Sequence, residues 1–123
     1  MFAFSSLRAD HITGGEMSYT YVSSNNGQHT YNVYIKLFMT CNENRRFNDP
    51  TIVSVFNKAT NLRVMDINVN LQNEETLRMN TFDPCITNPP AICFRLGHYY
   101  FTVTVPESSQ GYILSMQVNY RVN

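Results

Sequence analysis

The side chains in this sequence that could most readily act in catalysis or metal binding are its thiols and imidazoles. They belong to Cys41, Cys85, Cys93, His11, His29 and His98. A cysteine acts as a nucleophile when a neighbouring base such as histidine activates it. No sequence context brings a cysteine and a histidine together here, and no paired cysteine spacing suggests a zinc site. We therefore predict that the chain is not an enzyme.

A second candidate is the polar loop at residues 42–50, NENRRFNDP. Its Asn, Asp and Glu side chains offer the oxygen ligands that calcium prefers. Arg45 and Arg46 lie in the middle of this loop and would repel a divalent cation. The sequence therefore predicts no metal and no other cofactor. Arg45 and Arg46 are instead candidate ligand-facing residues.

Aromatic side chains are the remaining source of binding surface. The chain has eight Tyr and eight Phe but no Trp, and flat rings of this kind stack on sugars or peptides. Tyr99 and Tyr100 are adjacent, so in a strand they point to opposite faces and one of them is expected to be exposed. We take Tyr99 and Tyr100 as candidate ligand-facing residues.

The segment TFDPCITNPPAICF, residues 81–94, holds three of the five prolines and two of the three cysteines. Proline cannot donate to a sheet ladder, so the segment is predicted to be a loop. The spacing of Cys85 and Cys93 predicts a disulfide that closes this loop. Cys41 is then the unpaired cysteine, and alternation places it on the core side of its strand. The alternative is a partner for Cys41 outside this chain or in a second copy.

The elements that would position these residues are β-strands. Apolar and polar residues alternate with a period of two, and no stripe has a helical period. Strands are expected on both sides of the Asn26-Gly27 turn, and then over residues 51–59, 62–72, 75–79, 98–106 and 112–123. The predicted fold is all-β, an immunoglobulin-like antiparallel β-sandwich of about seven strands.

At the scale of the chain, the sequence has 123 residues, nine acidic and nine basic side chains, and a net charge of zero. This balance disfavours nucleic acid as a partner. No apolar run approaches the roughly 18 residues of a membrane-spanning helix. Residues 1–9, MFAFSSLRA, are interpreted as the remnant of a secretion signal or a disordered N-terminus. Residues 10–123 are predicted to form a single domain, one part of a longer polypeptide.

The order of several segments resembles a known family. These segments are HITGGEMSYTYV, YNVYIKLFMTC, PCITNPPAIC and YFTVTVPESSQGYILSMQ. Together they resemble the N-terminal β-sandwich domain of secreted Bacteroidetes surface proteins, which are gliding-motility-associated or adhesin-like. The family commonly has two adjacent cysteines after the last Ser-x-Gln. This chain has Asn119 and Tyr120 near those positions, so Cys41 lacks the partner that the resemblance would supply.

The resemblance implies a chain that is secreted or held at the cell surface, is sorted by type IX secretion and is often followed by PKD repeats. The function expected from it is a non-catalytic extracellular module with a spacer or adhesin role in gliding motility or surface attachment. Two alternatives stay open: a structural subunit of a filament assembled by strand-edge pairing, and a carbohydrate-binding accessory domain. The expected partners are other domains of the polypeptide, a surface glycan or protein, or further copies of the chain.

Overall fold

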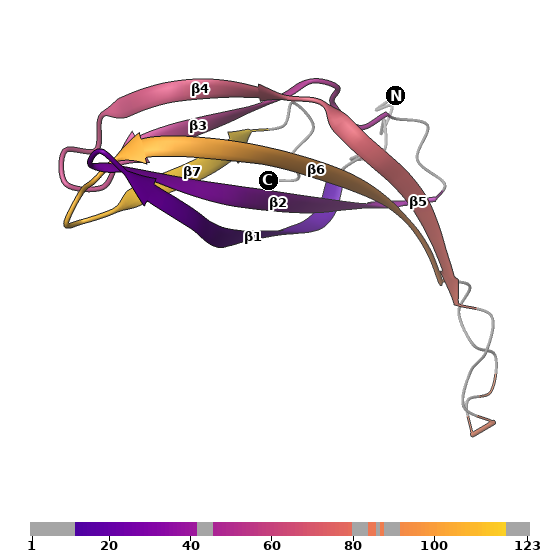
Figure 1. Cartoon of the computed structure of the whole chain (residues 1–123). Coiled ribbons are helices and arrows are strands. Elements are labelled where there is room, and N and C mark those ends of the chain that lie inside the picture. The colour runs from indigo at the N-terminus through magenta and orange to yellow at the C-terminus, as the bar shows by residue number, and fades with distance from the viewer. Residues whose placement is uncertain (1–11, 42–45, 80–83, 86, 88–91, 118–123) are drawn as a thin grey trace, which may run out of the picture.

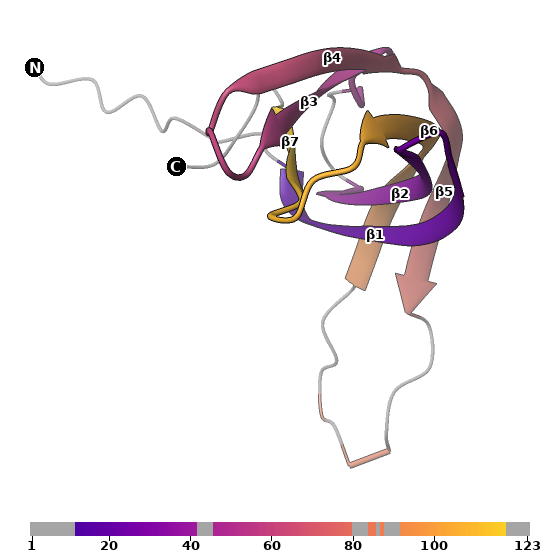
Figure 2. The same cartoon turned by 60° about the vertical axis from the view of Figure 1, so that its left-hand side comes forward.

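The computed structural model describes residues 12–41, 46–79, 84–85, 87 and 92–117, and these residues form seven strands in two antiparallel sheets (Figures 1 and 2). The strands are β1 (Ile12–Asn25), β2 (Gln28–Thr40), β3 (Thr51–Asn57), β4 (Arg63–Val69), β5 (Leu71–Met79), β6 (Ile92–Pro106) and β7 (Tyr112–Gln117). One sheet has the order β1-β2-β6-β5 and the other the order β4-β3-β7. The predicted antiparallel β-sandwich is confirmed.

The core lies between the two sheets and is built mainly from alternate residues of β2, β3 and β6. On β2, Val33, Ile35 and Met39 are each 3% exposed or less, and Val53 on β3 is fully buried. The intervening β2 residues, such as Tyr34, point to the opposite face because successive side chains alternate. Each buried aliphatic side chain contributes about 1.5–3 kcal/mol to folding. Buried and outward-facing residues therefore alternate along β2, as the period of two in the sequence predicts.

The turn between β1 and β2 has the backbone that its sequence demands. Asn26 has φ 54° and Gly27 has φ 74°, so both central residues are left-handed. That pair of conformations defines the two-residue hairpin turn for which Asn-Gly is the preferred sequence. The register continues from Asn25 opposite Gln28 along both strands. The predicted hairpin is confirmed.

The boundary between β4 and β5 differs from the prediction. Residues 62–72 were predicted to form one strand, but β4 ends at Val69 and β5 begins at Leu71 in the other sheet. The backbone N–H of Leu71 donates to Asp49 Oδ1 at 2.9 Å, which holds the start of β5. Ile67, Val69 and Leu71 all contribute to the core. The period of two therefore continues through the crossing, and alternation alone does not reveal it.

The disulfide also differs from the prediction: it joins Cys41 to Cys93, with the two Cα atoms 5.4 Å apart. The antiparallel register of β2 and β6 places Thr40 opposite Phe94, so the next pair brings Cys41 opposite Cys93. The N–H of Cys41 donates to the carbonyl of Cys93 at 3.2 Å. The predicted Cys85–Cys93 bond and the predicted unpaired Cys41 are therefore wrong. Cys85 is exposed and lies outside this bond.

β6 starts earlier than the sequence predicts, so the loop is shorter than expected. β6 begins at Ile92, within the segment that was predicted to be a loop and ahead of the expected start at residue 98. β5 and β6 pair as far as Met79 opposite Ile92 and extend beyond the three-stranded sheet (Figure 1).

The predicted signal remnant at residues 1–9 lies outside the described residues.

The segment that precedes β3 is anchored on the inner face of β6. Phe47 is 5% exposed, and a Cβ atom added to Gly97 would lie 2.9 Å from the Phe47 ring. Glycine is thus the residue that lets the ring approach the backbone of β6. Tyr99 donates its hydroxyl to the carbonyl of Asn48 at 2.6 Å. These contacts fill the inner face of β6 and leave the opposite face of the sheet to other side chains.

Candidate functional site

Polar and aromatic side chains gather on the outer face of the four-stranded sheet, which turns away from the core. They belong to the strand positions that alternate with buried ones, so His98 and Tyr100 flank the buried Tyr99 on β6. The register places Tyr34 opposite Tyr100 and Lys36 opposite His98. We define the outer face by Glu16, Asn32, Tyr34, Lys36, Glu75, His98, Tyr100 and Thr102, which lie on β1, β2, β5 and β6.

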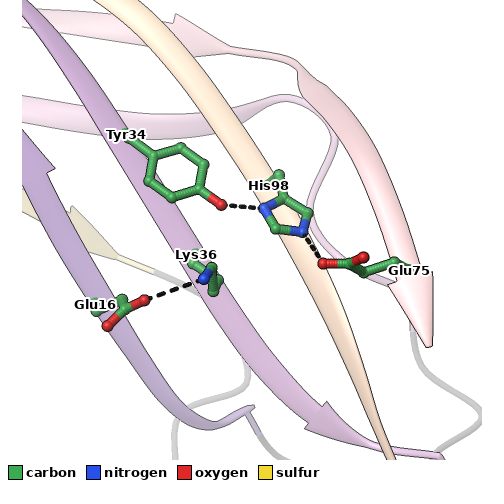
Figure 3. A network of polar contacts seen from close by, with 5 residues as sticks. All are labelled: Glu16, Tyr34, Lys36, Glu75 and His98. Carbon is green, nitrogen blue, oxygen red and sulfur yellow. Dashed lines mark hydrogen bonds and ion pairs between the residues drawn. The ribbon is translucent and has the colours of Figure 1, made fainter. Parts of the chain in front are cut away.

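A hydrogen-bonded chain crosses three strands of this face (Figure 3). The Tyr34 hydroxyl bonds to Nδ1 of His98, and Nε2 of His98 bonds to Oε1 of Glu75 at 2.8 Å. His98 is only 8% exposed. Its two ring nitrogens are therefore satisfied by two neighbouring strands, as a buried polar group requires.

The direction of these bonds follows from the Tyr34 phenol. Desolvation by burial raises the pKa of Tyr34 above its ordinary value; Tyr100 and the nearby carboxylates add to the rise, and Lys36 opposes it. The phenol therefore stays protonated and donates to Nδ1 of His98. In a neutral imidazole the proton is then on Nε2, which donates to the Glu75 carboxylate. Glu75 thus fixes the tautomer and the orientation of the His98 ring.

An ion pair lies beside this chain. Lys36 Nζ is 3.3 Å from Oε1 of Glu16 on β1, and it lies 5.7 Å from the centroid of the Tyr34 ring (Figure 3). The hydrogen bond to Glu16 is the main cause that raises the pKa of Lys36 above its ordinary value. Lys36 therefore remains charged, and its charge is balanced locally by Glu16.

Three rings form a continuous aromatic row on the same face. The Tyr34 ring stacks with His98 at a centroid distance of 5.7 Å and lies 4.5 Å from the centroid of Tyr100. Tyr100 is 58% exposed and forms the accessible end of the row. Beside it, Thr102 donates to Oδ1 of Asn32 at 2.9 Å. The outer face therefore combines a supported aromatic ring with amide and hydroxyl groups.

The order carboxylate, imidazole and hydroxyl invites comparison with a nucleophilic triad. A hydroxyl nucleophile needs a lowered pKa or a base that removes its proton during attack. His98 lies where such a base would lie, but burial raises the pKa of the Tyr34 phenol, which opposes the loss of its proton. The same hydrogen bonds hold the Tyr34 and His98 rings in place. Among the described residues, no group of three or more His, Cys, Asp or Glu could hold a metal ion.

The structure divides the predicted ligand-facing residues. Tyr100 lies on the outer face, but Tyr99 is fully buried and was wrongly assigned. Burial is the main cause that raises the pKa of Tyr99 to about 12, with Asp49 and Glu74 adding to it. Arg46 is exposed and precedes Phe47, which packs against the inner face, so the structure does not group Arg46 with Tyr100. Arg45 lies outside the described residues.

Sequence reasoning missed the support of Tyr100. In the sequence, His98 is a candidate only as a base for a cysteine or as a zinc ligand, and nothing singles out Tyr34 or Glu75. The signal that would reveal the network is the register of β2, β6 and β5, which places Tyr34, His98 and Glu75 within contact. Alternation of a single strand does not contain that information.

Comparison of the chain with family models, with curated proteins and with solved structures returned no match. Within the described part of the chain, no helix is long and apolar enough to cross a membrane. The Cys41–Cys93 disulfide is typical of proteins that fold in oxidising compartments and fits an extracellular protein.

Proposed function

We propose that this chain is a non-catalytic, glycan-binding module of a secreted surface protein, with an adhesin role. The observation that carries the proposal is the exposed Tyr100 ring, which contacts the Tyr34 ring, and the Tyr34 ring stacks in turn on His98. A flat ring held in one orientation binds the apolar face of a sugar with little loss of conformational freedom. Asn32 and Thr102 provide hydrogen-bonding groups for sugar hydroxyls beside the ring.

The charge on the outer face favours a neutral glycan. The single cation near Tyr34 among the described contacts is Lys36, and Glu16 balances it at 3.3 Å. The whole chain has a net charge of zero, so it exerts no general attraction for an acidic polymer. The disulfide and the resemblance to Bacteroidetes surface domains support a secreted location. An accessory role beside a glycan-degrading enzyme would use the same face.

The test is a screen on an array of neutral glycans, followed by calorimetric titration of the best binder. The expected dissociation constant is on the order of 0.1 to 1 mM. Tyr100→Ala should weaken binding about three- to tenfold, the effect of one stacked ring. Tyr21→Ala is the matched control, because Tyr21 is 53% exposed and lies on the core side of β1. Equal affinity for the two variants, or no glycan bound by the unaltered protein, would overturn the proposal.

A second candidate function is assembly through the edge strand β1. This strand has 14 residues, and Tyr19 and Val22 on it are 74% and 49% exposed. A long exposed edge with large apolar side chains is a template for pairing with another chain. Analytical ultracentrifugation should then show oligomers that Val22→Lys dissociates, because a charge on an edge strand opposes pairing. A monomer at all concentrations would exclude this candidate.

A further inference from the structure

The core side of β1 is only partly covered. Met17, Tyr19 and Tyr21 lie opposite Ile35, Val33 and Tyr31 of β2, and directly opposed residues share a face of the sheet. Their β2 neighbours Val33 and Ile35 are 2% exposed, yet Met17, Tyr19 and Tyr21 are 39%, 74% and 53% exposed. The second sheet is narrower than the sheet that carries β1, since it has three strands and ends at β7.

A cavity of about 390 Å³ opens at this place, between β1, β2 and β6 on one side and β7 on the other. Its walls include Met17, Tyr19, His29, Tyr31, Tyr112 and Leu114. The volume is within the range of small-molecule sites, about 300–1,000 Å³. Because it lies on the core side of the sheet, the cavity is separate from the outer face that carries Tyr100.

The chemistry of the walls selects an uncharged ligand. None of the residues that line the cavity is Asp, Glu, Lys or Arg, so a charged ligand would lose its hydration without gaining a counter-ion. The polar groups in the walls are phenol hydroxyls, the hydroxyl of Ser108 and the imidazole of His29. Nδ1 of His29 is buried and has no hydrogen-bond partner among the described residues. The imidazole that lines the cavity therefore carries a buried ring nitrogen with unused hydrogen-bonding capacity.

The walls are held in place before any ligand enters. Tyr112 donates its hydroxyl to the carbonyl of Pro106 at 2.6 Å. Tyr31 makes edge contacts with Tyr19 and Tyr21 at centroid distances of 6.0 and 5.8 Å. A ligand ring could make the same kind of edge or stacked contact with these tyrosine rings.

We propose that this cavity binds a small uncharged aromatic molecule that carries one hydrogen-bonding group. Its ring packs among Met17, Tyr19 and Tyr31, and its polar group lies beside His29. The proposal is independent of glycan binding, because it uses the opposite side of the same sheet and different side chains.

The test uses N-phenyl-1-naphthylamine, an uncharged aromatic amine whose fluorescence rises in apolar surroundings. Titration into the intact chain should give a saturable increase at one probe per chain. Tyr19→Ala removes a wall and should weaken binding at least about fivefold. His29→Phe keeps an aromatic side chain but removes both ring nitrogens, and should weaken binding about three- to tenfold. Tyr100→Ala is the control and should bind the probe with unchanged affinity.

A second readout does not depend on any variant. With ¹³C-methyl methionine, the probe should shift the Met17 methyl signal and leave Met65 unchanged, because Met17 lines the cavity and Met65 does not. Non-saturable binding, several probes per chain, or a shift at Met65 instead of Met17 would overturn the proposal. Equal affinity of Tyr19→Ala and the unaltered chain would also overturn it. Loss of glycan binding in Tyr100→Ala has no bearing on this result, so the two proposals fail separately.

Discussion

At the scale of single residues, the outer face depends on one buried imidazole that two neighbours keep in position. His98 accepts from the Tyr34 hydroxyl and donates to Glu75, and it is almost inaccessible to solvent. If Nε2–H of His98 lost its acceptor, little water could reach it as a replacement partner, because His98 is only 8% exposed. The residues that make Tyr100 a rigid platform are therefore also expected to contribute to folding stability.

Removing the acceptor tests this dependence. Glu75→Leu should lower the free energy of unfolding by about 1–3 kcal/mol, because Nε2–H of His98 loses its partner. Glu75→Gln keeps an oxygen acceptor and should cost less. Urea denaturation measures both values. The control is Glu16→Gln on the same face, where the Glu16 side chain is 63% exposed and a change within about 0.5 kcal/mol is expected. A Glu75→Leu effect no larger than that of Glu16→Gln would contradict the role given to Glu75.

The raised pKa of Tyr99 predicts how the free energy of unfolding changes at high pH. Its pKa rises from 10.0 to about 12 on folding, chiefly because of burial. The unfolded chain therefore loses this proton first, and the stabilisation is complete below pH 10 and lost as the pH rises through about 12. The loss attributable to Tyr99 is about 2–3 kcal/mol.

Tyr99→Phe separates this effect from general alkaline unfolding. The variant should be less stable at neutral pH by about 1 kcal/mol, since it lacks the hydrogen bond to the Asn48 carbonyl. Its stability should then fall less steeply between pH 10 and about 12 than that of the unaltered chain. Identical slopes in denaturant titrations across this range would show that Tyr99 is not the group responsible.

At the level of strands, the sequence predicts which residues of a strand share a face, but it does not predict which strands pair with one another. Alternation predicted correctly that one of Tyr99 and Tyr100 is exposed, but it did not tell which of the two enters the core. It did not reveal the crossing at Asn70, because the inward period continues from Val69 to Leu71. The outer network and the Cys41–Cys93 bond both depend on the β2–β6 register, which forms between segments distant in sequence.

The close approach of Phe47 to β6 gives a prediction at this scale. Gly97→Ala places a methyl group 2.9 Å from the Phe47 ring, so the ring must shift and stability should fall by about 1–3 kcal/mol. The double variant Gly97→Ala/Phe47→Leu should lose less than the sum of its two single changes, because the smaller side chain relieves the overlap. Gly14→Ala is the control, since its nearest neighbour is Phe38 at 4.0 Å. Thermal or urea unfolding provides the comparison, and strict additivity would count against the packing described.

At the scale of the whole molecule, the disulfide ties together two strands that are 52 residues apart in sequence. It closes a loop that includes β3, β4 and β5, so one covalent bond constrains strands of both sheets. The chain-entropy relation gives a stabilisation of about 4 kcal/mol for a loop of this length. The sandwich is thus expected to rely on an oxidising environment, as an exported domain does.

Substitution of the cysteines tests this account. Cys41→Ser should lower the free energy of unfolding by about 2–4 kcal/mol in oxidising buffer, whereas Cys85→Ser should leave it nearly unchanged. Peptide mapping without reduction should recover a Cys41–Cys93 pair. Recovery of a Cys85–Cys93 pair, or equal destabilisation by the two substitutions, would refute the connectivity.

We expect a neutral glycan to bind the outer face, and not the cavity or the polar loop that contains Arg46. NMR titration of the isotope-labelled chain with the best-binding glycan from the array locates the binding site. We predict saturable chemical-shift changes confined to Tyr34, Tyr100, Asn32 and Thr102 and their immediate neighbours. Changes centred on Tyr19 and Tyr31, or on Arg46, or no change at millimolar glycan, would contradict the claim.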